Sequence, residues 1–258
     1  MSLIRTETDA RGVAVVTLAR ADKHNALSAP MMSELEETAR ALAADKSVRV
    51  VVLAAEGPSF CAGGDLAWMR AQFDMDPETR RMESRRIATM LGALYDLPQP
   101  LIGRVQGNAF GGGVGLISVC DVAIGVETAK LGLTETRLGL LPANIGPYVL
   151  ARMGGTRASE VFMSARVFDT VEAVRLNLLS RSVAPSDLDS AVDAEITPYL
   201  SCAPGAVAEA KALMRALSGP VTQQQVDVAI DALAARWQTD EAREGVGAFF
   251  DKRKPSWQ

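Results

Sequence analysis

The chain has 258 residues, 48% of them hydrophobic, and carries a formal net charge of −4 at pH 7. This length can bury a full core in one domain, or in one domain with an appendage. The acidic balance argues against a dedicated nucleic-acid binder. No apolar run reaches the roughly 18 residues of a membrane span, and charged residues at positions 5, 7 and 9 interrupt any signal-like stretch. We therefore expect a cytoplasmic protein with no membrane or nucleic-acid partner.

The reactive side chains exclude several kinds of chemistry. Cys61, Cys120 and Cys202 lie far apart and form no C-x-x-C pair, so neither a zinc site nor a disulfide framework is expected. The single histidine, His24, is not accompanied by the G-x-S-x-G elbow of a nucleophilic triad. No phosphate-binding P-loop is present, and Leu116 stands where a dinucleotide fingerprint needs its last glycine. We expect no metal and no separate cofactor.

The first third of the chain alternates extended and helical patterns. Residues 13–18 (VAVVTL) are typical of a buried strand, and Ser28 is placed to cap a helix that begins near Pro30. The apolar face of that helix is Met31, Leu35, Ala39 and Leu42. Residues 49–54 (RVVVLA) form an unbroken apolar run, which suits a strand buried on both faces.

A glycine-containing turn and a long helix follow. In residues 56–66 (EGPSFCAGGDL), Gly63 and Gly64 allow backbone conformations that other residues resist, and Asp65 can cap the next helix. Residues 74–96 then have a helical pattern. The basic residues of that helix are Arg80, Arg81, Arg85 and Arg86, which we interpret as a solvated face.

The central stretch, residues 107–142, carries the strongest functional signal. Glycines 111–113 lie between an extended apolar run at 100–106 and an amphipathic segment at 114–120. A strand that turns through glycines into a helix leaves backbone N–H groups free to hold a negatively charged oxygen. The simpler interpretation is a tight strand-to-helix turn.

Glu135 follows among apolar neighbours, which are Leu131, Leu133, Leu138 and Leu140. Such burial should raise its pKa and suit it to proton transfer beside a carbonyl group. Taken alone, a glutamate in this position is more often a surface or capping residue.

Helices dominate the rest of the chain. We expect a strand at 121–125, helices within 142–153 and 158–164, a helix capped by Asp169 or Thr170 that runs to residue 178, and a brief strand at 182–184. Helices alone follow at 188–201, 206–217, 223–237 and 241–252. The order predicts an α/β fold in which β-β-α units recur and helices close the chain.

Five stretches together resemble the crotonase superfamily, the enoyl-CoA hydratase/isomerase proteins. They are KHNALS, SFCAGGDL, GNAFGGGVGL, LTETRLGLLP and AFFDKRKP, and their order and spacing make the resemblance specific. The resemblance implies a crotonase-like spiral of ββα units over residues 1–195 and a C-terminal helical trimerisation region over 196–258. It also implies an acyl-CoA thioester substrate and a homotrimer or dimer of trimers.

The resemblance assigns roles to particular residues. By motif position, the N–H groups of Ala62 and Gly112 would bind the thioester oxygen as it becomes an enolate, and Glu135 would be the catalytic carboxylate. The same motifs place Gly63, Gly64, Asp65 and His24 beside the substrate. Lys252 and Phe249 match positions that reach the coenzyme A of a neighbouring subunit, although an ordinary helix end would have the same pattern. The arginines at 80, 81, 85 and 86 have a second interpretation as a contact for an anionic acyl tail.

One departure from the family pattern leaves the reaction open. Hydratases of the family have two glutamates, and the first should follow the glycine triplet by two residues, where this chain has Gly115. The sequence around Glu135 is similar to that of methylglutaconyl-CoA-type hydratases. This similarity favours addition of water to a 2-enoyl-CoA in fatty-acid or branched-chain breakdown. The single glutamate instead resembles the family's isomerases, in which one glutamate moves a proton between carbons and converts 3-enoyl-CoA to 2-enoyl-CoA. A third alternative is a non-catalytic scaffold that keeps the acyl-CoA fold.

Overall fold

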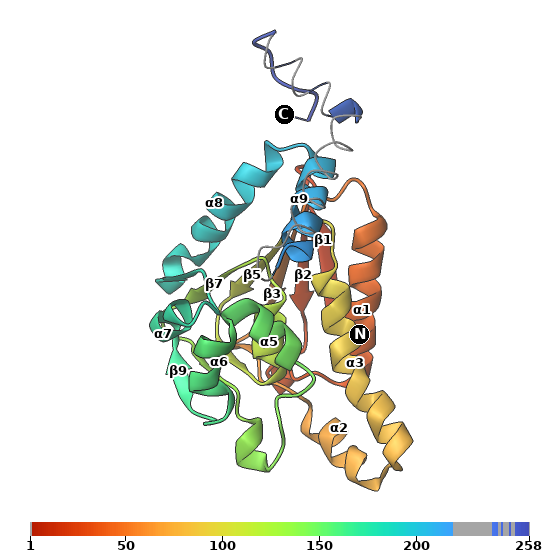
Figure 1. Ribbon diagram of the computed structural model, residues 1–258, viewed down its shortest axis with the longest axis vertical. Coiled ribbons are helices and arrows are strands. Elements are labelled where there is room, and N and C mark those ends of the chain that lie inside the picture. The colour runs from red at the N-terminus through yellow and green to blue at the C-terminus, as the bar shows by residue number, and fades with distance from the viewer. Residues whose placement is uncertain (1, 219–238, 242–243, 245–247, 249–250, 258) are drawn as a thin grey trace.

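The computed structural model describes residues 2–218, 239–241, 244, 248 and 251–257, which form two β-sheets flanked by helices (Figure 1). The larger sheet contains, in spatial order, β1 (Ile4–Thr8), β2 (Val13–Leu18), β3 (Val50–Ala55), β5 (Leu101–Val105), β7 (Val122–Val126) and β10 (Arg181–Val183). Its first two strands are antiparallel and all later neighbours are parallel.

The smaller sheet is made of short strands that follow those of the larger one. In spatial order these are β4 (Ser59–Cys61), β6 (Asn108–Phe110), β8 (Lys130–Gly132) and β9 (Val167–Asp169). The successive pairs β3–β4, β5–β6 and β7–β8 each place one strand in each sheet, and a helix follows each pair. This repeated ββα unit confirms the predicted crotonase-like α/β architecture.

The helices cover the sheets on several sides (Figure 1). They are α1 (Ala29–Ala44), α2 (Leu66–Ala71), α3 (Pro77–Tyr95), α4 (Gly112–Ser118), α5 (Gly146–Met153), α6 (Gly155–Phe162), α7 (Thr170–Arg175), α8 (Leu188–Leu200) and α9 (Pro204–Ala216). Short 3₁₀ turns include η1 (Ala21–Lys23) and η3 (Glu135–Leu138). The predicted helix at 223–237 and most of that at 241–252 lie outside the described residues.

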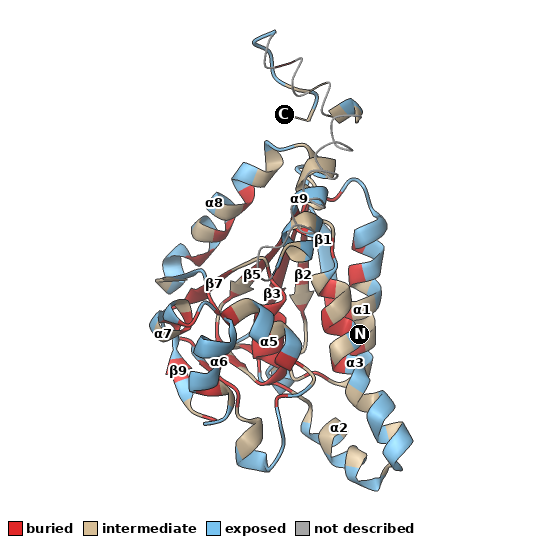
Figure 2. Ribbon diagram, viewed as in Figure 1, coloured by how far each residue is buried: buried red, intermediate tan, exposed pale blue. Residues whose placement is uncertain are grey.

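The central strands of the larger sheet, β3, β5 and β7, are buried on both faces, as their unbroken apolar runs predict. Val50 and Val52 of β3 belong to a cluster with Leu188, Val192 and Ile196 of α8. The alternate residues of β3 belong instead to the main core, which includes the predicted apolar face of α1. Figure 2 shows the strands mostly buried and the outward faces of the helices exposed.

Helix caps were predicted with mixed success. Asp65 accepts hydrogen bonds from the N–H groups of Ala67 and Trp68, and Asp169 accepts one from Glu172, so both caps are confirmed. Ser28 precedes α1 as expected, but its side chain makes no capping bond. The second residue of α1 is a proline, which has no N–H for such a cap to accept.

The helix after the glycine triplet is more completely buried than its sequence pattern predicts. The amphipathic segment expected at 114–120 is α4, and every residue of this helix is buried. Gly115, at the centre of the helix, faces Ile145 and Leu91. The neighbouring elements therefore cover the helix face that an amphipathic pattern would leave exposed to solvent. A central helix with no solvent face follows from this packing.

The C-terminal part of the described chain is anchored to the sheet by a buried ion pair. Lys211 of α9 donates to Asp121 at 2.5 Å and to the carbonyl of Gln99 at 2.8 Å. The predicted boundary between residues 195 and 196 falls inside α8, which is one continuous helix, so the division into two regions stays a prediction. Among the described residues, none of the helices combines the length and hydropathy needed to cross a membrane.

Candidate active site

Glu135 begins η3, directly after β8 of the smaller sheet. Its side chain is partly buried, and its Oε2 atom is buried without a hydrogen-bond partner among the described residues. Loss of water around the carboxylate raises the pKa of Glu135, and a hydrogen bond from its own backbone offsets this only in part. A carboxylate with a raised pKa and an unused acceptor is suited to take up and return a proton.

The apolar surroundings predicted for Glu135 are correct on one side only. Leu131 and Leu133 are fully buried. Leu138 and Leu140 are 63% and 42% exposed, so they do not enclose the carboxylate. The difference arises because η3 ends at Gly139 in a left-handed conformation, and the segment that follows lies at the surface.

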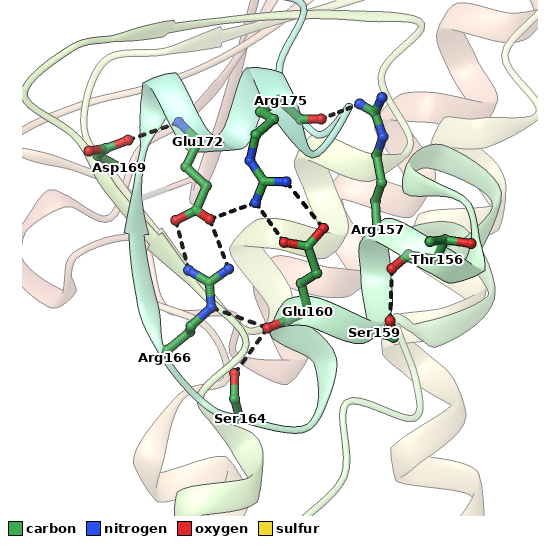
Figure 3. A network of polar contacts seen from close by, with 9 residues as sticks. All are labelled: Thr156, Arg157, Ser159, Glu160, Ser164, Arg166, Asp169, Glu172 and Arg175. Atoms are coloured by element: carbon green, nitrogen blue, oxygen red, sulfur yellow. Dashed lines mark hydrogen bonds and ion pairs between the residues drawn. The ribbon is translucent and has the colours of Figure 1, made fainter.

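An ionic network connects α6, α7 and the segment before β9 (Figure 3). Arg166 forms two hydrogen bonds with Glu172, at 2.7 and 2.9 Å, while Arg175 bridges Glu172 and Glu160. The two hydrogen bonds from Arg166, followed by the one from Arg175, lower the pKa of Glu172 to about 2. These contacts join α6 to α7 around β9, the strand that pairs with β8. The network therefore supports the strand that leads into Glu135.

The glycine triplet lies directly against Glu135. Gly111 has a φ of +49°, and a β-carbon at this position would be 3.0 Å from Glu135 Oε1. The same β-carbon would be 3.9 Å from the Cα of Gly63, so Gly111 lies between the carboxylate and the loop at 62–65. A side chain here would be strained and would push on the carboxylate.

Gly112 begins α4, and its N–H has no acceptor among the described residues. A β-carbon at Gly112 would lie 3.8 Å from the Cα of Gly63 and 2.7 Å from a methyl group of Leu27. Gly113 approaches the carbonyl of Cys61 so closely that its β-carbon would be 2.4 Å from that oxygen. The two loops predicted to form an oxyanion site are therefore in contact.

The N–H of Ala62, by contrast, is already used. It donates to the carbonyl of His24 at 3.0 Å, so it is not free to bind a substrate oxygen, contrary to the prediction. Gly64, two residues later, lies opposite Leu27 in an isolated parallel β-bridge. The two hydrogen bonds of this bridge run from the N–H of Leu27 to the carbonyl of Gly63 and from the N–H of Asp65 to the carbonyl of Leu27, so Gly64 itself takes part in neither. The N–H of Gly64 has no acceptor among the described residues and points away from Leu27.

The sequence motif does not indicate that the N–H without an acceptor belongs to Gly64 and not to Ala62. It depends on the left-handed turn at His24 and Asn25, whose φ angles are +50° and +54°. Asn25 is fully buried, and its amide group donates to the carbonyls of Glu56 and Ser59. This anchoring places the carbonyl of His24 where it accepts the N–H of Ala62.

A partly buried ion pair fixes the other side of the same loop. Arg20 donates to Asp65 at 2.7 Å and also to the carbonyl of Ala26. Burial alone would raise the pKa of Asp65, but hydrogen bonds from the Trp68 N–H and from Arg20 lower it overall. Asp65 is thus an ionised helix cap that holds the loop beside Gly64. With its pKa lowered in this way, Asp65 is not suited to act as a general acid.

At residue 115, where the two-glutamate hydratases have the first of their glutamates, the structure has no room for a longer side chain. A β-carbon at Gly115 would lie 2.6 Å from a methyl group of Ile145 and 3.2 Å from one of Leu91. The sequence could show that Gly115 departs from the family pattern, but not that Ile145, thirty positions away, fills the space. Glu135 is therefore not matched by a carboxylate at residue 115.

The remaining predicted contact residues are His24, Lys252 and Phe249. His24 is exposed, and its Nδ1 atom is 3.1 Å from the hydroxyl of Ser59. Lys252 is exposed, with a left-handed φ of +53°, and Phe249 lies outside the described residues. Burial raises the pKa of the Cys61 thiol to about 12, so this cysteine is not a thiolate nucleophile despite its nearness to the glycines.

Comparison with known proteins shows which family the chain resembles. The enoyl-CoA hydratase/isomerase family model matches residues 8–258. The chain is 31% identical to mitochondrial methylglutaconyl-CoA hydratase of Mus musculus, over 98% of this chain and 81% of that protein. The crystal structure of an enoyl-CoA hydratase from Shewanella pealeana superposes with a TM-score of 0.94 at 36% identity, covering 99% of this chain and 96% of that one. One from Mycobacterium smegmatis has a TM-score of 0.93 at 34% identity, covering 100% and 99%. The chain belongs to the enoyl-CoA hydratase/isomerase family.

Proposed function

We propose that the protein is an enoyl-CoA hydratase that adds water to a 2-enoyl-CoA thioester, using Glu135 as its single acid–base group. The observation that carries the proposal is the contact between Glu135 and the glycine triplet. It places a carboxylate of raised pKa next to backbone N–H groups that lack acceptors. The hydratase names of the relatives support the same reaction.

The oxyanion site in this proposal consists of the N–H groups of Gly64 and Gly112. Both lack acceptors among the described residues, and their loops touch through Gly63. When water adds to C3 of the enoyl group, the electron pair of the double bond moves towards the thioester oxygen. Fixed donors stabilise that oxygen without reorganising, and one such donor is worth roughly 2.7–4 kcal/mol of the barrier.

The proton steps need only one carboxylate. Glu135 accepts a proton from the water molecule as its oxygen bonds to C3, and the resulting enolate is held by the two N–H groups. Glu135 then returns the proton to C2, which gives the 3-hydroxyacyl-CoA and restores the carboxylate. The CoA group belongs to the substrate, so the proposed reaction requires no further cofactor.

A second candidate function has one observation in its favour. Gly115 and the packed Ile145 leave no carboxylate at the position where two-glutamate hydratases have one. A single base can also move a proton between C2 and C4, which would convert a 3-enoyl-CoA to a 2-enoyl-CoA. That reaction uses the same oxyanion site and consumes no water.

A direct assay separates the two functions. The conjugated thioester of crotonyl-CoA absorbs in the near ultraviolet, and this absorbance should disappear as water adds. A 3-enoyl-CoA should give no lasting rise in the same band if hydration is the activity. If 2-enoyl thioesters of every chain length stay unchanged while 3-enoyl-CoA gains the conjugated band, the isomerase function replaces the hydratase.

The proposal extends to the assembly and the location of the protein. We propose a homotrimer or a dimer of trimers in the cytoplasm. The apolar side chains that face solvent near the site, Leu138, Leu141 and Met163, would be covered by such assembly, since they are 63%, 74% and 68% exposed in the single chain. Mass measurement by light scattering tests this, and a monomer at micromolar concentration would contradict it.

A further inference from the structure

Two side chains of α2 lie directly against Gly64, whose N–H belongs to the proposed oxyanion site. Outside its own loop, the atoms nearest to a β-carbon built on Gly64 belong to Met69, at 3.2 Å, and to Trp68, at 3.7 Å. A thioester oxygen that binds the N–H of Gly64 stays within about 3 Å of that nitrogen. The first carbons of the acyl group would therefore come close to the side chains of α2.

The segment that carries these side chains is attached to α3 by hydrogen bonds. Every residue of α2 is at least partly exposed, and Figure 1 shows the helix beside the N-terminal end of α3. Arg80 of α3 donates to the carbonyls of Gln72 and Met75, at 2.8 and 2.7 Å. The hydroxyl of Ser84, one helical turn later, donates to the side chain of Gln72 at 3.2 Å. This face of α3 therefore holds α2 through polar contacts.

Glu83, on the same face of α3, fixes the position of Trp68. The indole Nε1 donates to Glu83 Oε2 at 3.0 Å, and Glu83 Oε1 accepts a hydrogen bond from Arg86 at 2.8 Å. The hydrogen bond from Trp68 is the largest influence on the pKa of Glu83, which is lowered overall despite partial burial. The carboxylate is thus ionised at neutral pH, and its bond to the indole is charge-assisted.

The two side chains beside Gly64 differ in rigidity. Met69 is unbranched and can change its rotamer to fit a ligand. The indole of Trp68 has only two side-chain torsions, and its polar end is held by Glu83. Trp68 is therefore the one of the two that can define where an acyl group lies.

We propose that the acyl group of the substrate packs against the indole of Trp68, and that Glu83 is a positioning residue that holds this indole beside Gly64. The inference rests on the proposed function, because it concerns the acyl group whose thioester oxygen the N–H of Gly64 binds. Glu83 touches no substrate atom in this account and acts only through Trp68. Its hydrogen bond keeps the acyl chain in one place relative to Glu135, across the loop at 62–65.

Calorimetric titration tests the contact without relying on turnover. The probes are butyryl-CoA, a saturated and unreactive thioester, and free coenzyme A, which lacks the acyl group. Trp68→Ala should weaken binding of butyryl-CoA about tenfold, because the acyl group loses its contact with the indole. The affinity for free coenzyme A should not change in this variant.

The role of Glu83 is tested by removing its acceptor at nearly constant side-chain length. Glu83→Met should weaken binding of butyryl-CoA about threefold, the effect of losing one hydrogen bond. Glu83→Gln keeps an oxygen that accepts from the indole and should restore the affinity. Arg86→Gln is the matched control on the same helix, since it leaves the bond between Trp68 and Glu83 in place.

A double-mutant cycle separates positioning from a purely structural role. If Glu83 acts through Trp68, Glu83→Met should have no further effect on butyryl-CoA binding in the Trp68→Ala background. Trp68→Phe, which keeps a ring but lacks the N–H, provides a second cycle if Trp68→Ala does not fold. Its combination with Glu83→Met should bind butyryl-CoA no more weakly than either single variant.

Three outcomes would overturn the inference. The first is a folded Trp68→Ala variant with unchanged affinity for butyryl-CoA. The second is an equal loss of affinity for free coenzyme A, which would place the indole against another part of the ligand. The third is an effect of Glu83→Met that is the same whether or not the indole N–H is present. Failure to hydrate crotonyl-CoA would contradict the proposed function in a separate assay, so the two failures are distinguishable.

Discussion

The carboxylate of Glu135 lies against the backbone of Gly111, and a β-carbon built on Gly111 would be only 3.0 Å from Oε1. These residues are 24 positions apart in the sequence and come from different turns of the ββα spiral. The contact brings the acid–base group beside Gly112, whose N–H has no acceptor among the described residues. It also makes the site sensitive to single methyl groups.

Gly111→Ala should therefore lower kcat in addition to destabilising the fold. The left-handed φ of +49° is strained for alanine, at roughly 1–3 kcal/mol, and the added methyl group pushes on the carboxylate. Gly154→Ala is the matched control, because Gly154 has a φ of +74° with open space around it. Both variants should lose stability in thermal unfolding, but only Gly111→Ala should lose kcat. Equal kcat values in the two variants would contradict the contact's role.

Glu135→Gln should separate activity from stability. Removing the acid–base group should lower kcat by about 100-fold or more, the usual contribution of a positioned proton carrier. The same change removes a buried charge, so the variant should unfold at a higher temperature than the unaltered protein at pH 7. Steady-state kinetics and calorimetry check the two effects, and a less stable variant would argue against the buried carboxylate.

The pH dependence follows from the raised pKa of Glu135. Burial disfavours the ionised form in the folded state, so the destabilisation is fully present above the folded-state pKa and disappears as pH falls below the unfolded value of about 4.5. The stability gained by Glu135→Gln should shrink over that window. The acidic limb of kcat/KM should likewise lie above pH 4.5, since the ionised form is the base. A limb at or below the ordinary glutamate value would contradict this.

The oxyanion assignment can be tested by changing single backbone atoms. Replacing the N–H of residue 64 by an ester oxygen, through incorporation of the corresponding hydroxy acid, should lower kcat by about 100- to 1000-fold. The same replacement at residue 62 removes the hydrogen bond to the carbonyl of His24, so it should lower stability and leave kcat within a few-fold. The reverse pattern would restore the original assignment to Ala62.

Adding the glutamate that this chain lacks at residue 115 should not increase its activity. In Gly115→Glu, the new side chain would start 2.6 Å from a methyl group of Ile145, and such overpacking costs about 1–3 kcal/mol. We expect lower stability and no gain in hydration. Combining it with Ile145→Ala should recover much of the stability, as measured by denaturant unfolding. A fully stable and faster single variant would show that the space is not closed.

The sequence predicted the long elements of the fold because their side-chain patterns are unambiguous. The strand at 13–18 and the apolar face of α1 match the structure closely. The short strands β4, β6, β8 and β9 were not predicted as strands, since three residues give too few side chains for a period-two pattern. Their pairing depends on neighbours that are distant in the chain.

The sequence predicted which loops form the site, but it did not predict which N–H group of the loop at 62–65 lacks an acceptor. The motifs identified Glu135, Gly112 and the loop at 62–65, and these come together. Which N–H of that loop is free depends on the turn at Asn25, whose contacts reach residues 56 and 59.

The most direct test of the account follows the oxygen of water. Crotonyl-CoA incubated with the protein in ¹⁸O-labelled water should give 3-hydroxybutyryl-CoA that carries the label in its hydroxyl group, as measured by mass spectrometry. Glu135→Gln should form this product at least about 100-fold more slowly. Unlabelled, unchanged crotonyl-CoA, or labelled product formed equally fast by Glu135→Gln, would contradict hydration by a single buried glutamate.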